Sequence, residues 1–187
     1  MKNLVYAFAI LFATQLFGEI SSATKFIPQD FDVLSYNVYM DLTAAPSPQM
    51  HGYNEIKFVW TTDLPDAKFY FHLSGLSVDS AFCHSEQIPI AKSEEQVDGE
   101  QYYILSRADI ADQDTAILKI YYSGTMSYYP SNFGWAGVTS TDGILYSMGV
   151  GFSNPAVSSS RYWMPCYDHP SDKALLNASF LVDSSMS

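Results

Sequence analysis

The sequence is short of positive charge. It contains nine Lys and Arg side chains against twenty Asp and Glu, and its formal net charge is −11 at pH 7. Proteins that bind nucleic acid neutralise rows of phosphates with basic side chains, and peripheral proteins use the same side chains on anionic lipid. The composition therefore argues against nucleic acid and against an anionic membrane surface as partners.

Cysteine is equally scarce, since Cys83 and Cys166 are the only two. An oxidising compartment would permit a disulfide between them. Buried thiols are, however, the common state of cysteine, and sequence spacing alone does not establish the geometry of a bridge. We favour two unpaired thiols, and the sequence leaves the pairing open.

The sequence also lacks the ligand spacing of a metallopeptidase. The H-E-x-x-H motif places two histidines one helical turn apart with a glutamate base between them. The four histidines are His51, His72, His84 and His169; no two are four residues apart, and none precedes Glu. A G-x-S-x-G nucleophile elbow is missing as well. We therefore predict no catalytic residue and no metal ligand in this chain.

Long apolar runs are confined to the start of the chain. Lys2 precedes the mostly apolar residues 4–17, and the small residues Ser21, Ser22 and Ala23 follow. A basic start, an apolar stretch and a small-residue cleavage site are typical of a secretory signal peptide. The run is also shorter than the roughly 20 residues that cross a bilayer. We predict a signal peptide at 1–23 and an exported product (periplasmic, extracellular or cell-surface) without a membrane span.

The remainder alternates apolar and polar residues with period two, which is typical of strands with one buried face. In the first strand this pattern predicts a buried face made of Leu34, Tyr36, Val38, Met40 and Leu42. Residues 92–100 are expected to be a polar hairpin tip, and 127–160 mostly loop. The expected strands are 31–42, 52–60, 67–73, 76–82, 87–91, 101–105, 115–122, 144–148 and 174–182.

Short strands at regular spacing, without a long amphipathic helix, predict an all-β fold: a two-sheet sandwich or a saddle-shaped antiparallel domain. We assign 24–187 to one such domain. The chain stops five residues after Val182 without a capping element. A natural terminus and a cut through a longer polypeptide are both open, and we expect the domain to be truncated at this end.

The segment 161–174 has the most unusual composition, Arg-Tyr-Trp-Met-Pro-Cys-Tyr-Asp-His-Pro-Ser-Asp-Lys-Ala. Pro165 and Pro170 fix the backbone on either side of Cys166, so a rigid corner is expected. Its aromatic side chains supply area to bury. The expected role of the corner is structural.

Charged side chains in the same segment are expected to hold the corner against the sheet. Asp168 and Asp172 are acidic, and each has Arg161 or Lys173 as a candidate partner. Trp163 and Tyr167 provide the apolar contacts beside them.

This segment resembles the end of the N-terminal β-domain of the aminopeptidase N-like (gluzincin) zinc metallopeptidases. Stretches 31–36, 52–56, 71–78, 118–124 and 146–152 resemble upstream strands of that domain, so the resemblance covers 31–182. The matching residues of the signature are Arg161, Trp163, Pro165, Cys166, Tyr167, Asp168, Asp172, Lys173 and Ala174.

The resemblance implies a non-catalytic domain that walls the substrate cleft and docks a downstream or separate zinc domain, which would remove N-terminal residues from peptides. Zinc is implied in a full-length member and no cofactor in this chain, which should be inactive alone. The family's acidic residue for the substrate's α-amino group falls on Ser153 or Asn154. Neither is charged, and a neutral hydrogen bond is weaker than a charge-assisted one.

A second interpretation is a stand-alone secreted β-sandwich that binds protein or carbohydrate. Exposed aromatic side chains suit such contacts, and the segment 128–135 contains Tyr128, Tyr129, Phe133 and Trp135. Asn177-Ala178-Ser179 matches a glycosylation acceptor. Whether Asn177 is used is open.

Overall fold

The computed structural model describes residues 29–97, 100–110, 115–129, 136–148, 150–153, 156–169 and 171–184. Its regular structure is fourteen strands and two 3-10 turns, η1 (Arg107–Asp109) and η2 (Ser160–Tyr162). Within those ranges no helix has the length and apolar character needed to cross a membrane. The predicted all-β class is confirmed.

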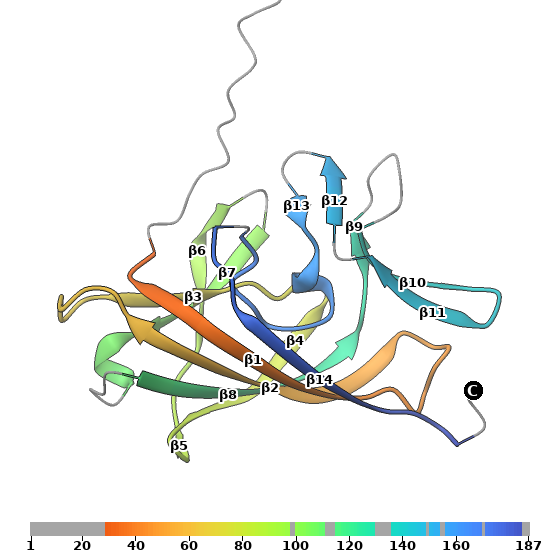
Figure 1. The fold of residues 1–187 in the computed structure, drawn as a ribbon, viewed down its shortest axis with the longest axis horizontal. Helices are drawn as coiled ribbons and strands as arrows, with labels where there is room; N and C mark the ends of the chain where they lie inside the picture. The colour runs from red at the N-terminus through yellow and green to blue at the C-terminus, as the bar shows by residue number, and fades with distance from the viewer. Residues whose placement is uncertain are drawn as a thin grey trace, which may run out of the picture.

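A six-stranded sheet forms the base of the molecule (Figure 1). Neighbouring strands are antiparallel except β1 and β14, which run parallel. A parallel pair requires a long connection, and here the rest of the domain lies between the two strands. The predicted antiparallel arrangement is thus present, with one parallel pair added at this edge. In sheet order the strands are β14 (Leu175–Leu181), β1 (Phe31–Asp41), β2 (Gln49–Trp60), β8 (Thr115–Thr125), β4 (Leu76–Cys83) and β5 (Glu86–Gln87).

Three smaller sheets lie on one side of this base, in the upper half of Figure 1. We call the side of the six-stranded sheet that faces them the inner face, and the other side the outer face. The first small sheet is β3 (Lys68–Phe71), β7 (Glu100–Ser106) and β6 (Ala91–Val97). The others are β11 (Ile144–Met148), β10 (Ala136–Thr141) and β9 (Tyr128–Tyr129), and the pair β12 (Val150–Ser153) and β13 (Ala156–Ser158).

The core fills the space between the inner face and the small sheets. Aromatic rings dominate it: Phe69 stacks on Phe58 with ring centroids 4.2 Å apart, and Phe31 lies 4.5 Å from Phe69. Because these rings come from β1, β2 and β3, they join the base to the first small sheet. The largest fully buried side chains also include Phe71, Met40, Ile56, Leu105, Leu118, Ile120 and Tyr122.

The first strand departs from the predicted alternation. Its register with β2 shifts between Val33 and Ser35, as at a β-bulge. An extra residue turns the preceding side chains to the opposite face. Phe31 and Val33 are therefore buried, whereas Leu34, predicted to be buried, is 37% exposed. Beyond the bulge Tyr36, Val38 and Met40 are buried, as predicted.

The strand bounds in residues 87–100 were predicted wrongly, although the expected hairpin is present, since β6 pairs antiparallel with β7. The expected strand 87–91 is only the end of β5 and the start of β6, and most of the expected polar tip 92–100 belongs to β6 and β7. Ser93 is buried, and its hydroxyl accepts a hydrogen bond from the Tyr102 N–H at 3.3 Å. A polar side chain with a partner was thus mistaken for a solvated one. The Asp98-Gly99 pair lies outside the described residues.

Residues 127–160 were also predicted wrongly, as mostly loop. They contain β9 to β13, of which only 144–148 was expected. The β10–β11 hairpin turns through Asp142 and Gly143, which have φ of 54° and 79°. An Asp-Gly pair with two positive φ angles is the favoured two-residue hairpin turn, so a local signal was present.

Candidate functional site

The signature segment lies over the inner face and is fastened to the chain just after β3. The His72 N–H donates to the Cys166 carbonyl at 2.7 Å, and the Cys166 N–H donates back at 3.1 Å. The Ser74 N–H also donates to the Arg161 carbonyl at 2.8 Å. We refer to residues 161–169 with these attachments as the corner.

An ion pair lies inside the corner. The Arg161 Nε donates to Asp168 Oδ2 at 2.6 Å, and the Arg161 Nη2 donates to the Asp168 carbonyl at 3.3 Å. The two side chains are only 8% and 1% exposed. Arg161 and Asp168 therefore hold together the start and end of the corner, which are seven residues apart in the sequence.

His72 is a neutral acceptor in the corner. Its Nδ1 accepts a hydrogen bond from the Asp168 N–H at 3.2 Å. Burial, together with the positive charge of Arg161, lowers the pKa of His72 to about 4. Since its ring is uncharged near neutral pH and receives a backbone donor, His72 has a structural role here.

Neither cysteine forms a disulfide and both are buried, in agreement with the interpretation favoured from the sequence. Burial raises the pKa of the Cys166 thiol well above its ordinary value. A thiol that stays protonated is a poor nucleophile and a poor metal ligand, so Cys166 serves as a small packing group.

Side chains from β1 and β2 fix the corner to the sheet. Tyr36 accepts the Tyr167 N–H on its hydroxyl oxygen at 3.1 Å, and the Asn54 amide donates to the Pro165 carbonyl at 2.8 Å. Both are buried. The contacts of these two side chains and of His72 with the corner were not predicted from the sequence. A signal was available for Asn54, because this polar residue stands two residues before Ile56, at a core position of the strand.

Asp172 makes contacts different from those expected. Its Oδ2 accepts hydrogen bonds from the Gln29 amide at 2.8 Å and from the Val33 N–H at 3.3 Å. It thus ties the end of the signature to the bulge in β1. Lys173 is exposed, and Pro170 lies outside the described residues.

Trp163 contributes to an apolar recess beside the corner. The recess has a volume of about 310 Å³ and lies between β1, the β10–β11 hairpin and β14. Met40, Leu42, Leu145, Trp163 and Phe180 are among its lining side chains.

The inner face continues from this recess onto β14. Leu176 is paired in register with Tyr36, and Phe180 with Met40, so both point to the core side of the sheet. Their partners on β1 are buried, yet Leu176 is 50% and Phe180 is 53% exposed. We call the recess together with Leu176 and Phe180 the apolar edge.

The residues expected at the substrate's amino group are only partly described. Ser153 ends β12 and pairs with Ala156 of β13, and Asn154 lies outside the described residues. Within the described ranges no three His, Cys, Asp or Glu side chains gather into a group that could hold a metal ion. The residues that the structure describes therefore offer no set of ligands that fits a zinc ion.

No protein-family model matches the chain, and no curated protein matches it. Solved structures do. The M1 zinc metallopeptidase from Deinococcus radiodurans is similar with a TM-score of 0.65 and 20% identity, over 84% of this chain and 34% of that one. Yeast LTA4 hydrolase matches with a TM-score of 0.62 and 15% identity, over 86% of this chain and 25% of that one.

Legionella pneumophila aminopeptidase A is also similar, with a TM-score of 0.60 and 13% identity, over 86% of this chain and 17% of the other. The chain thus spans about a third or less of the solved structures it matches. It has the fold of a domain of M1 zinc metallopeptidases, as the sequence resemblance predicted.

Proposed function

We propose that this chain is the non-catalytic N-terminal β-domain of an exported zinc aminopeptidase. Its role is to dock a separate or downstream zinc domain and to wall one side of the substrate cleft. The family fold supports this proposal, because the matching region covers only 34%, 25% and 17% of the three similar enzymes. Zinc and the glutamate base belong to the other domain, and the chain alone does not hydrolyse peptides.

The apolar edge is the observation that carries the docking role. A sheet face that is buried on β1 and left open on β14 fits a partner that covers it, since contiguous exposed apolar surface is typical of interaction sites. The corner and the apolar edge are in contact, because Trp163 belongs to the corner and also lines the recess. We assign the zinc domain as the occupant because the similar solved enzymes are two-domain or larger proteins.

Recognition of the substrate's free amino group is expected to be weak. Ser153 and Asn154 occupy the place where the resemblance implies an acidic residue. A neutral oxygen makes a weaker hydrogen bond to an ammonium group than a carboxylate does. In the assembled enzyme, contacts with other parts of the peptide would therefore contribute more to substrate binding than the charge of its N-terminus.

Charging the apolar edge tests the docking role. The double substitution Leu176→Glu with Phe180→Glu should convert a self-associating chain into a monomer, because it removes the apolar surface that isolated copies bury against each other. Both side chains are about half exposed, and surface substitutions usually change stability by only about 0.5 kcal/mol. Sedimentation equilibrium measures the association and thermal unfolding the stability.

Leu64→Glu is the matched control, because Leu64 is 57% exposed but lies in the loop after β2. It should leave self-association unchanged. A wild-type chain that is monomeric and monodisperse at all accessible concentrations would contradict the docking role. Release of amino acids from peptides by the purified chain, with stoichiometric zinc and no added subunit, would overturn the proposed function itself.

Export is tested by the mass of the mature chain. In a secreting host the product should begin at Thr24, since Ser21 and Ala23 are the small residues that a signal peptidase requires. Leu11→Arg places a charge in the apolar stretch and should retain the precursor in the cell. Intact-mass measurement on both fractions distinguishes the two. A secreted product that still begins at Met1 would contradict the assignment of 1–23.

A further inference from the structure

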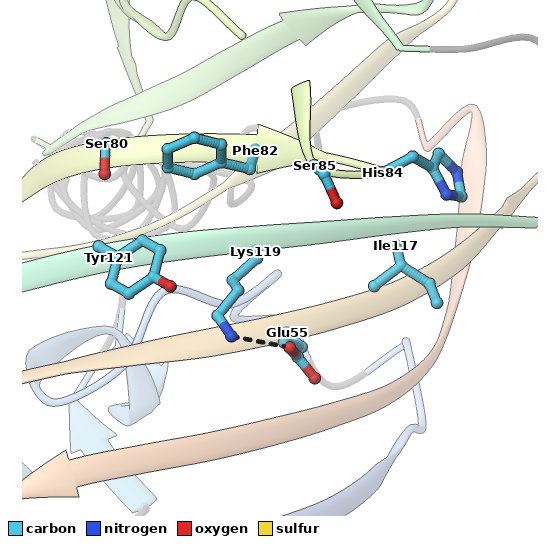
Figure 2. A pocket seen from close by; sticks show the side chains of 8 residues that line it. All are labelled: Glu55, Ser80, Phe82, His84, Ser85, Ile117, Lys119 and Tyr121. Carbon is cyan, nitrogen blue, oxygen red and sulfur yellow. Dashed lines mark hydrogen bonds and ion pairs between the residues drawn. The ribbon is translucent and has the colours of Figure 1, made fainter. Parts of the chain in front are cut away.

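The outer face of the six-stranded sheet contains a hollow with a volume of about 720 Å³. It lies over β2, β8 and β4, on the side away from the smaller sheets. Figure 2 shows its side chains standing on these neighbouring strands and on the turn that follows β4. It is separate from both the corner and the apolar edge, which use the inner face.

A row of aromatic rings crosses the strands beside this hollow. Tyr39, Tyr53 and Tyr121 are directly paired across β1, β2 and β8. Their ring centroids are 5.4 Å and 5.7 Å apart. Phe82 of β4 meets Tyr121 edge to face at 5.9 Å. Tyr121 is 38% exposed, so the row presents ring surface to a ligand in the hollow.

The charges in the hollow cancel each other. Glu55 and Lys119 are paired in register, and Lys119 Nζ lies 3.0 Å from Glu55 Oε1 (Figure 2). The same Nζ lies 3.8 Å from the ring centroid of Tyr53, at the range of a cation–π contact. The side chains are therefore held in place, and the site offers a donor and an acceptor without net charge.

The turn after β4 brings two more polar groups. His84 and Ser85 both have positive φ, 47° and 75°, where a two-residue hairpin would favour Asn-Gly. Residues with side chains are strained in this region of backbone space, and such strain is found at functional sites. Both side chains line the hollow, as does Ser80.

We propose that this hollow binds a neutral oligosaccharide. Sugar rings present apolar C–H surface that packs on aromatic rings, and hydroxyls that both donate and accept hydrogen bonds. The backbone groups of β2, β8 and β4 are already paired in their ladders, so side chains must meet the ligand. Glu55, Lys119, Ser80 and His84 supply donors and acceptors, and the net charge of −11 disfavours an acidic glycan.

Isothermal titration calorimetry of the full chain with maltohexaose, cellohexaose and chitohexaose tests this site. At least one of the three should bind, and Tyr121→Ala should weaken it by about tenfold, which corresponds to about 1.4 kcal/mol. Glu55→Gln should weaken it as well, by removing an acceptor for sugar hydroxyls. Circular dichroism establishes that each variant keeps its β structure.

Tyr146→Ala is the matched control, because Tyr146 is 48% exposed, against 38% for Tyr121, but lies on the β10–β11 hairpin, where it lines the recess on the inner face. It should leave the affinity unchanged. Loss of affinity in this control, or no heat with any of the three sugars at millimolar concentration, would overturn the proposal. Tighter binding of a hyaluronan hexasaccharide, or of a neutral hexapeptide, would overturn it too. The Tyr146 control alters the recess of the apolar edge, but the sugar titrations do not measure self-association, so the docking role is tested separately.

Discussion

Asp168→Asn is expected to lower the free energy of unfolding by about 3–5 kcal/mol. Asp168 and Arg161 form a hydrogen-bonded ion pair of 2.6 Å that is almost completely buried. Removing one partner leaves the other charge in a medium that solvates it poorly, and this costs more than the intact pair contributes. Asparagine keeps the size of the side chain, so the loss reports the charge and not a cavity.

The matched control is Glu55→Gln, which breaks an ion pair on the outer face. Lys119 and Glu55 are 3.0 Å apart, but their side chains are partly exposed. Exposed pairs contribute about 0–1 kcal/mol. Urea denaturation of both variants at neutral pH measures the two losses. Equal losses for the two variants would contradict the view that burial makes the corner sensitive.

Strands whose pattern comes from burial could be predicted from the sequence. Alternation is visible because one face of β2 and β8 packs against the core, as Ile56, Phe58, Leu118 and Ile120 do. The resemblance in 161–174 likewise identified the segment that forms the corner. In both cases the decisive information is local in the sequence, so a single chain contains it.

What could not be predicted depends on partners far away in the chain. The Asp168 N–H meets His72 across 96 residues, and the Asn54 amide meets Pro165 across 111. No spacing rule links such pairs. The parallel pairing of β14 with β1 likewise joins residues that are far apart in the sequence. The bulge at Val33 turns the side chains before it to the opposite face of the sheet, and nothing in the composition of the strand signals this change.

The exposure of the β14 side chains could not be predicted from the sequence either. Its alternation predicted a strand but not its exposure, because Leu176 and Phe180 look like core residues in sequence. Only their pairing with the buried Tyr36 and Met40 reveals an inner face without a cover from the described residues. The docking proposal therefore rests on tertiary structure, and the family resemblance on sequence.

Acid should destabilise the fold through His72. Its pKa falls from 6.5 to about 4 on folding, with burial as the largest cause and the charge of Arg161 next. Between these two pH values the unfolded chain binds a proton that the folded chain does not, so stability decreases as the pH falls. A shift of this size corresponds to about 3 kcal/mol, all of it lost by about pH 4.

Other titratable groups near His72 also affect how stability changes with pH, so the contribution of His72 has to be measured separately from theirs. Asp168 acts against the shift, whereas His169 adds to it. Asp172 has a raised pKa because of burial, so its protonation favours the folded state in acid and opposes the His72 effect. Comparing variants at each pH cancels these contributions, because they are present in both chains.

His72→Asn is the variant to compare, since its side-chain oxygen can still accept the Asp168 N–H but does not titrate. Its free energy of unfolding, measured by urea denaturation from pH 7 to pH 4, should decline by about 3 kcal/mol less than that of the wild type. His51→Asn is the control, because the His51 side chain is 71% exposed, and it should follow the wild type. Parallel curves for the wild type and His72→Asn would mean that the ring takes up its proton in the folded corner at its ordinary pKa, and that the fold withstands the loss of Nδ1 as an acceptor. The Asp168 N–H would then need another acceptor, and His72 would no longer account for the attachment of the corner to the end of β3.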